Sequence, residues 1–259
     1  MTLSDVKCFV LDMDGTFYLG GQLIEGSLEF IDRVIATGRD FLFLTNNSSH
    51  NANFYVRKLA KMGLRVDRSR VLTSGEATCA RLQALYPGKR VFVLGNEFLL
   101  EEFAEAGIPV DQENPEIVVI GFDTTLDYKK MWAVCDFVRA GLPYIATHPD
   151  FNCPTETGFM PDIGAIMAFI EASTGRRPDL IVGKPHSGIV EAALKRTGLQ
   201  VGELAMVGDR LYTDIETGLR CGMLSILVMS GETTEAMLAE SETKPDLKFG
   251  RLSDMIPLL

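Results

Sequence analysis

The chain has 259 residues, of which 46% are hydrophobic and 23% are charged, and this balance is typical of a soluble globular protein. Its formal net charge of −10 argues against a broad nucleic-acid-binding face, which needs clustered basic residues, and against docking on anionic lipid. An acidic chain that binds a phosphate must therefore supply local positive charge from a Lys, an Arg or a metal ion.

Cysteine usage and the N-terminal segment both predict a cytoplasmic protein. The five cysteines are odd in number and widely separated, which favours reduced thiols over a disulfide framework or a zinc site. The first apolar run is short and stops at Asp12, so we expect no signal peptide. No apolar stretch approaches the ~20 residues of a membrane span, and we expect no membrane partner.

Eight short apolar runs predict buried strands, because each is rich in Val, Ile, Leu or Phe and is bounded by turn residues. Helical patterns with glycine stops lie between some of them, and alternating strands and helices predict an α/β fold with a Rossmann-like, doubly wound parallel sheet. The predicted strands are 7–11, 41–44, 91–95, 117–121, 144–147, 180–183, 204–208 and 224–229, and the clearest helices are 27–37, 51–62 and 188–197.

Ligands of such a sheet lie beyond the carboxyl ends of its strands, so the residues that follow each strand are candidates for the site. Asp12 and Asp14 follow the first strand in one tight turn, with Gly15 providing backbone freedom. Strand alternation should direct Asp12 into the cleft with Asp14 nearby. The alternative is an acidic turn that caps a helix.

The strand 41–44 is followed by Thr45 and Asn46. A hydroxyl, an amide and backbone N–H groups suit the oxygens of a phosphate. The same loop also suits helix capping, through Ser48 or Ser49. Both interpretations stay open, because one loop can serve both purposes.

Two further strand ends carry charged residues. Lys184 follows the strand that ends near 183, where its ammonium can pair with an aspartate and a phosphate, although a solvated Lys is the alternative. Asp209 and Asp214 follow 204–208, and grouped carboxylates suit Mg²⁺, whereas Asp214 can instead cap a helix. The strands 91–95 and 117–121 end in less distinctive loops, which suggests that they belong to a different layer or domain.

These acids make sense together only with a cation among them, because gathered carboxylates repel one another. At this point the chain resembles the haloacid dehalogenase superfamily of phosphatases, and in particular its NagD-like type IIA branch with a C2 cap. The resemblance spans nearly the whole chain. It is carried by DMDGT (12–16), LTNNSS (44–49), GKP (183–185) and GDRLYTD (208–214), together with TSGEA (73–77) and ATHPD (146–150).

The resemblance implies an Mg²⁺-dependent mechanism. Asp12 would attack phosphorus and form an aspartyl-phosphate, while Asp14 would protonate the leaving oxygen and then activate the hydrolytic water. Mg²⁺ would be held by Asp12, the backbone carbonyl of Asp14 and Asp209, with Asp214 orienting the waters of the metal.

The same resemblance implies how the phosphoryl group is bound. Thr45, Asn46 and the N–H groups near Gly15 would hold its oxygens. Lys184 would screen the charge of Asp12 and stabilise charge that develops in the transition state.

The resemblance also implies a smaller inserted domain. We expect residues 80–177 to form a C2-type α/β cap and residues 1–79 and 178–259 to form the hydrolase core. In the cap, His148 and Asp150 are candidates for contact with the leaving group, or they simply shape a Pro-rich turn.

The predicted function is hydrolysis of small organic phosphate monoesters, with nucleotides, sugar phosphates and p-nitrophenyl phosphate as candidate substrates. One alternative is a phosphotransferase or phosphomutase that uses the same chemistry. Another is a non-catalytic protein that binds a phosphorylated metabolite. A P-loop or dinucleotide-binding protein is disfavoured, because neither glycine motif occurs in a suitable place.

Overall fold

The computed structural model describes residues 2–155 and 157–259, which form two compact units. The first unit comprises the chain up to Thr45 together with Tyr55–Leu72 and Lys184–Leu259. The second comprises Asn46–Phe54 and Thr73–Gly183. It therefore contains the whole of the predicted cap, 80–177, and extends beyond it by 46–54, 73–79 and 178–183. The chain crosses between the units at short connections, and a smaller α/β unit is inserted into a core, as predicted.

The first unit is built on a six-stranded sheet in the order β14-β13-β12-β1-β4-β5. β1 pairs in parallel with β12 on one side and β4 on the other, so that Leu11 lies opposite both Val207 and Phe43. The carboxyl ends of these three strands therefore lie at one edge of the sheet. The strands are β1 (Cys8–Leu11), β4 (Asp40–Thr45), β5 (Val71–Thr73), β12 (Leu204–Gly208), β13 (Leu224–Val228) and β14 (Leu247–Phe249).

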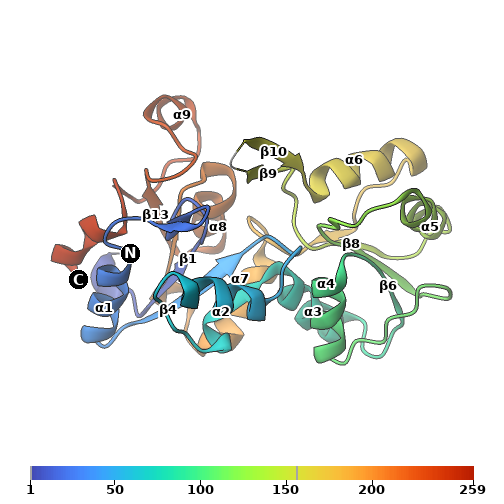
Figure 1. Ribbon diagram of the computed structural model, residues 1–259, viewed down its shortest axis with the longest axis horizontal. Helices are drawn as coiled ribbons and strands as arrows, with labels where there is room; N and C mark the ends of the chain where they lie inside the picture. The colour runs from blue at the N-terminus through green and yellow to red at the C-terminus, as the bar shows by residue number, and fades with distance from the viewer. Residues whose placement is uncertain (1, 156) are drawn as a thin grey trace. The chain divides into compact units, whose positions relative to one another are not determined.

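Helices flank this sheet, and a short antiparallel hairpin follows β1 (Figure 1). Every residue of β1, β12 and β13 is buried, which fits a parallel sheet that is covered on both faces. The helices are α1 (Ser27–Ala36), α2 (Ala52–Lys61), α7 (Ser187–Thr197), α8 (Glu216–Cys221) and α9 (Glu235–Glu240), the hairpin is β2 (Tyr18–Leu19) with β3 (Gln22–Leu23), and a π-helical turn spans Leu211–Ile215.

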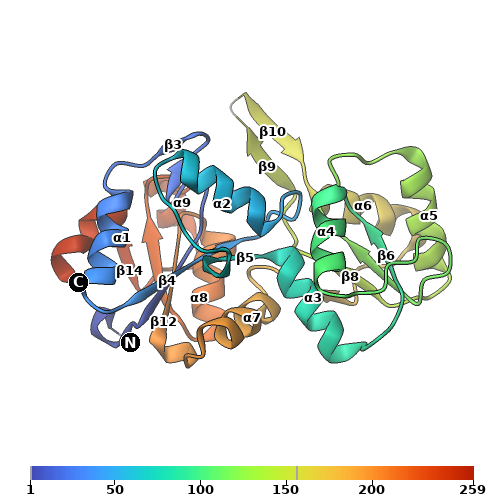
Figure 2. The ribbon, with the colours of Figure 1, turned by 60° about the horizontal axis from the view of Figure 1, so that its bottom comes forward.

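The second unit contains a four-stranded parallel sheet in the order β11-β8-β7-β6. Two of its strands, β6 and β8, are labelled in Figure 2. Its apolar core lies between this sheet and helices α5 and α6. The strands are β6 (Val91–Leu94), β7 (Ile117–Ile120), β8 (Tyr144–Ala146) and β11 (Leu180–Ile181), the helices are α3 (Ser74–Leu85), α4 (Glu97–Glu105), α5 (Tyr128–Arg139) and α6 (Ile163–Thr174), and β9 (Asn152–Thr155) and β10 (Gly158–Pro161) form an antiparallel hairpin.

The predicted α/β fold is therefore confirmed. The runs 91–95 and 117–121, which were expected in a different layer or domain, contain β6 and β7 of the second sheet. One strand was placed in the wrong sheet. Leu180–Ile181 pairs with β8 and not with the core sheet, so Lys184 does not follow a strand that neighbours β1. Within the described residues, no helix combines the length and the apolar content that a membrane crossing requires.

Candidate active site

Asp12 directly follows β1, at the carboxyl end of this strand of the core sheet. Its backbone N–H donates to Val207 O at 2.9 Å, so the ladder with β12 extends one residue beyond the strand. Its carboxylate accepts a hydrogen bond from Lys184 Nζ at 2.5 Å. The sheet therefore fixes the backbone of Asp12, and the lysine fixes its side chain.

Lys184 bridges two carboxylates from different parts of the core. Besides Asp12, its Nζ donates to Asp214 Oδ1 at 2.6 Å and to Leu44 O at 3.5 Å. The side chain is 3% exposed, so this is a buried charge that is held by two counter-charges. The alternative of a solvated Lys is therefore wrong, although Lys184 reaches this place from a loop before α7.

Asp209 lies one residue beyond β12 and is enclosed by backbone. Its carboxylate accepts from Glu232 N at 2.7 Å and from Thr16 Oγ1 at 3.3 Å, while Thr233 Oγ1 donates to its carbonyl at 2.5 Å. Two glycines pack directly against the carboxylate. A Cβ on either Gly15 or Gly231 would overlap Asp209 Oδ2.

Asp214 is positioned by the π-helical turn Leu211–Ile215. Its Oδ2 accepts from Arg210 N at 3.1 Å, and its own N–H donates to Arg210 O at 3.1 Å. A Cβ on Gly208 would overlap the Asp214 side chain, so this glycine allows the turn to fold back on β12. The side chain of Asp214 is fully buried, and it bonds to Lys184, so a role limited to capping a helix is excluded.

The pKa values of Asp12, Asp209 and Lys184 are shifted, because these charged groups are buried next to one another. Burial raises the pKa of Asp12 to about 6, although Lys184 opposes the rise. Burial, together with the charges of Asp12 and Asp214, raises the pKa of Asp209 to about 8. Burial alone would lower the pKa of Lys184, but its two carboxylate partners outweigh this effect and raise it.

The cluster has the donor set of a hard divalent cation. One carboxylate oxygen each from Asp12, Asp209 and Asp214 lies within 4.8 Å of the other two. The raised pKa values of Asp12 and Asp209 mean that these two carboxylates gain from any added positive charge. Mg²⁺ prefers oxygen ligands and usually takes a few carboxylates, so the residues fit this ion.

Of the other predicted residues, Asp14 lies in the same turn but outside the carboxylate cluster. Burial raises the pKa of Asp14, and the charge of Lys58 acts in the opposite direction. Gly15 N donates to Tyr18 O at 2.7 Å, and Gly15 O accepts from Ser230 Oγ at 2.8 Å, so the turn is tied down on both sides.

Thr45, the last residue of β4, and Asn46, the residue after it, belong to different units. Thr45 is the last residue of its stretch in the first unit, and Asn46 is the first residue of its stretch in the second. Both side chains are buried, at 7% and 5% exposure. The expected capping of α2 by Ser48 or Ser49 is replaced by another contact. The Asn51 side chain accepts from Phe54 N at 3.0 Å near the start of that helix.

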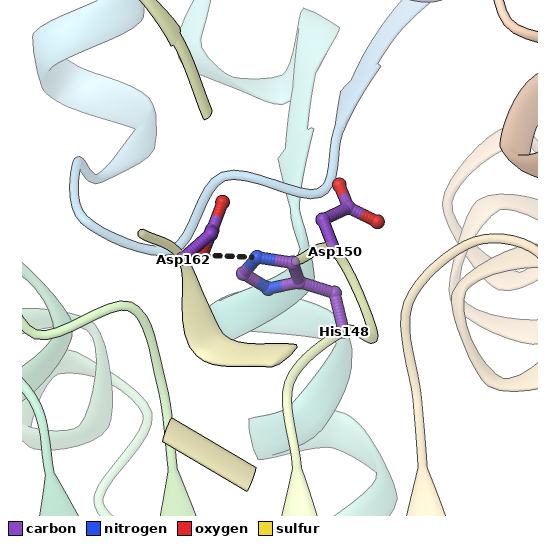
Figure 3. Close-up of side chains that lie close together, drawn as sticks. All are labelled: His148, Asp150 and Asp162. Atoms are coloured by element: carbon purple, nitrogen blue, oxygen red, sulfur yellow. Dashed lines mark hydrogen bonds and ion pairs between the residues drawn. The ribbon is translucent and has the colours of Figure 1, made fainter. Parts of the chain in front are cut away.

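The two predicted cap residues lie close to Asp162 (Figure 3). His148 is fully buried, and its ring nitrogens are within bonding distance of Thr147 Oγ1, at 3.0 Å, and Asp162 Oδ1, at 3.1 Å. Asp150 accepts from Asn46 Nδ2. Both ring nitrogens of His148 are thus already engaged inside its own unit, which argues against the predicted contact with a leaving group.

Sequence reasoning missed Arg210, Thr16 and the segment 230–233. Burial acts to lower the pKa of Arg210, but the charges of Asp12 and Asp209 outweigh this effect and raise the pKa, so this partly buried guanidinium is a second cation at the cluster. Its Nε pairs with Glu232 Oε2 at 3.0 Å. Arg210 lies inside the GDRLYTD motif and was within reach of the same reasoning, whereas no local pattern marks 230–233.

Gly15 and Gly20 offer a matched test of the packing around Asp209. Both have positive φ, 86° and 59°, but a Cβ meets Asp209 only at Gly15 and meets nothing within 4 Å at Gly20. We expect Gly15→Ala to lower phosphate release by about 100-fold or more through displacement of Asp209. Gly20→Ala shares the backbone strain of about 1 kcal/mol and should keep most of the activity. Equal losses in a steady-state phosphate-release assay would contradict the packing argument.

Family models and curated relatives show which proteins the chain resembles. A model of haloacid dehalogenase-like hydrolases matches residues 9–109, and a second model of the same group matches 181–255. A protein named 5'-nucleotidase YutF from Bacillus subtilis is 33% identical over 253 residues, with 98% of each chain covered. A protein named acid sugar phosphatase from Staphylococcus aureus is 36% identical over 255 residues, again with 98% of each chain covered.

Solved structures agree with the fold across both units. A 4-nitrophenylphosphatase from Thermotoga maritima is 48% identical and superposes with a TM-score of 0.96, covering 98% of each chain. NagD from E. coli K-12 is 31% identical with a TM-score of 0.89, covering 96% of this chain and 98% of its own.

Proposed function

The chain belongs to the haloacid dehalogenase-like hydrolases, in their NagD-like branch, and is a phosphatase of small phosphate esters; on this premise we propose that it depends on Mg²⁺ and uses Asp12 as its nucleophile. The observation that carries the proposal is the position of Lys184. Its ammonium lies between Asp12 and Asp214, in a cluster that also contains Asp209. A buried lysine so placed keeps Asp12 ionised and directed at one point.

The reaction divides into two displacements at phosphorus. Asp12 Oδ attacks, the bond from phosphorus to the ester oxygen breaks, and the leaving oxygen takes a proton from Asp14. A water molecule then attacks the aspartyl-phosphate and gives its proton to Asp14, which releases inorganic phosphate and regenerates Asp12. The raised pKa of Asp14 suits a group that must first donate and then accept a proton.

The remaining roles concern charge. Thr45, Asn46 and N–H groups near Gly15 bind the phosphoryl oxygens, and Lys184 offsets the charge that develops on them. Bound Mg²⁺ would supply further positive charge next to the phosphoryl group. It would be held by Asp12, Asp209 and the backbone carbonyl of Asp14, with Asp214 orienting its waters.

For substrates we propose nucleotide and sugar phosphates, with p-nitrophenyl phosphate as an artificial one, because relatives and structural neighbours carry these names. We propose that residues 80–177 act as the cap that selects the leaving group. The five cysteines are free, which is consistent with a cytoplasmic location.

A phosphate-release screen over small phosphate esters, with Mg²⁺ and with EDTA, tests the proposal. We expect turnover of several esters with Mg²⁺, loss of about 100-fold or more with EDTA, and recovery when Mg²⁺ is returned in excess. Undiminished activity in EDTA would overturn the metal dependence. A requirement for an added hydroxyl acceptor would favour a phosphotransferase.

The pKa of Asp209 leads to a separate prediction for stability. In the folded, metal-free protein this carboxyl has a pKa of about 8, above its ordinary value of 3.8, so the folded state binds a proton that the unfolded chain has released. Metal-free stability should therefore fall as the pH rises from about 4 to about 8. Mg²⁺ at about 100 times its Kd should restore about 2.7 kcal/mol, or roughly 5–10 °C in Tm.

Thermal unfolding at about pH 5 and about pH 8, with and without Mg²⁺, measures this coupling. The gain in Tm from Mg²⁺ should be larger at the higher pH. Asp209→Asn should remove most of the pH dependence in the metal-free protein. The prediction fails if Mg²⁺ raises Tm equally at both pH values.

A further inference from the structure

Asn46 is held on two sides by side chains of its own unit. Its Nδ2 donates to both oxygens of Asp150, at 3.1 and 3.3 Å, across 104 residues of sequence. Its backbone carbonyl accepts a hydrogen bond from Ser74 Oγ. Such contacts fix both the peptide and the side chain of a residue that directly follows Thr45.

We propose that Asp150 is a positioning residue of the phosphatase reaction, which acts by fixing the carboxamide of Asn46. The inference rests on the proposed function, in which Asn46 binds phosphoryl oxygens. It gives Asp150 a role inside the second unit that differs from contact with the leaving group.

The orientation of the Asn46 carboxamide follows from its two ends. A carboxylate accepts hydrogen bonds only, so Asp150 selects the Nδ2 end of the amide and not the Oδ1 end. The Oδ1 end lies against Gly183, where a Cβ would come to 2.7 Å. Because the amide is planar, fixing one N–H toward Asp150 also fixes the direction of the other N–H.

Asp150 is itself held in place by the backbone around it. Gly164 N donates to Asp150 O at 2.7 Å, and Asp162 N donates to Phe151 O at 2.9 Å. A Cβ on Gly164 would come to 2.9 Å from Asp150 O, so this glycine allows the close approach of α6. The loop that carries Asp150 is therefore anchored to the start of α6.

A buried chain of hydrogen bonds also fixes this loop, and Figure 3 shows its last link, between His148 and Asp162. All its side chains are 3% exposed or less, and the residues that it joins all belong to the second unit. Such a chain strengthens cooperatively in a medium of low dielectric. It runs from Phe122 N to Ser48 Oγ at 2.9 Å, to Thr147 Oγ1 at 3.0 Å, to His148 Nδ1 at 3.0 Å, and from His148 Nε2 to Asp162 Oδ1 at 3.1 Å.

The test is a double-mutant cycle on Asp150 and Asn46. Asp150→Ala should raise KM and the inhibition constant of inorganic phosphate by about tenfold, because one oriented hydrogen bond is lost, with a smaller effect on kcat. Asn46→Ala should have a similar or larger effect. In Asp150→Ala/Asn46→Ala, the loss should equal that of Asn46→Ala alone, since Asp150 acts only through Asn46.

Two further variants separate positioning from general stability. Asp150→Asn keeps an oxygen that accepts from Asn46 Nδ2 and should recover most of the lost affinity for phosphate. Asp179→Ala removes a carboxylate that accepts from Tyr144 N at 2.7 Å in the same unit, and it should lower Tm without changing the phosphate inhibition constant.

The results of these experiments distinguish failure of the positioning role of Asp150 from failure of the proposed function. Additive losses in the cycle, or an unchanged phosphate inhibition constant in Asp150→Ala, would overturn the positioning role and leave the proposed function standing. Full activity in Asp12→Asn would overturn the proposed function itself. Non-additive losses with an unchanged Tm would establish the inference.

Discussion

Replacing Asp12 with Asn is expected to lower phosphate release by about 10⁴-fold or more, because the variant lacks the nucleophilic oxygen while binding is largely kept. Asn has the same shape as Asp and retains an oxygen that accepts from Lys184, whose Nζ lies 2.5 Å from the present carboxylate. Burial raises the pKa of Asp12 to about 6, so the substitution also removes a charge that the fold disfavours. The metal-free variant should therefore unfold at the same temperature as the wild type or slightly above it.

The measurement pairs steady-state phosphate release with thermal unfolding in EDTA. Asp123→Asn is a matched control, because Asp123 is another buried carboxylate that pairs with a lysine, Lys130 Nζ at 2.7 Å, but it lies in the second unit. This control should keep its activity. Full activity in Asp12→Asn would remove the nucleophile from the proposal, whereas a low Tm in that variant would point to damage of the fold.

Much of the fold was predictable because its strands are apolar on both faces. A parallel strand that is covered on both sides reads as an unbroken apolar run, and β1, β12 and β13 are of this kind. Residues Leu247–Phe249 carry no such pattern, since the strand is short and only partly buried. The β9–β10 hairpin was missed for a similar reason, because most of its residues are exposed.

The strand predicted at 180–183 was placed in the wrong sheet, because hydrophobic periodicity does not tell which sheet a strand joins. The run 180–183 is apolar and ends in a glycine, as the core strand at 204–208 does, but pairing with β8 places it in the other sheet. Which sheet a strand joins depends on contacts between distant parts of the chain, and a local pattern is silent on them. Lys184 reaches Asp12 all the same, because the loop before α7 returns to the core.

The candidate site, like the fold, was predictable from the sequence only in part. The residues of the carboxylate cluster stand in motifs that end strands or begin loops, and the sequence was sufficient to group Asp12, Asp209 and Asp214 with Lys184. Their partners from the segment 230–233 are fixed by backbone contacts that no spacing encodes. The link between Asn46 and Asp150 spans 104 residues and required the folded second unit.

Replacing Lys184 with Met tests the charge balance of the whole cluster. The variant leaves Asp12 and Asp214 buried without their shared ammonium, and loss of one partner of a buried pair costs about 3–5 kcal/mol. In EDTA we expect Tm to fall by roughly 10 °C. Activity should fall by about 10³-fold, because the charge that develops on the phosphoryl oxygens also loses its partner.

A second substitution separates these two effects. Asp214→Asn in the Lys184→Met background removes one of the unpaired charges and should recover about half of the lost Tm. It should recover none of the activity, since the catalytic cation is still absent. If activity returned together with stability, Lys184 would be a structural residue only. Arg210, whose charge interacts with those of Asp12 and Asp209, would then be the cation that serves the reaction.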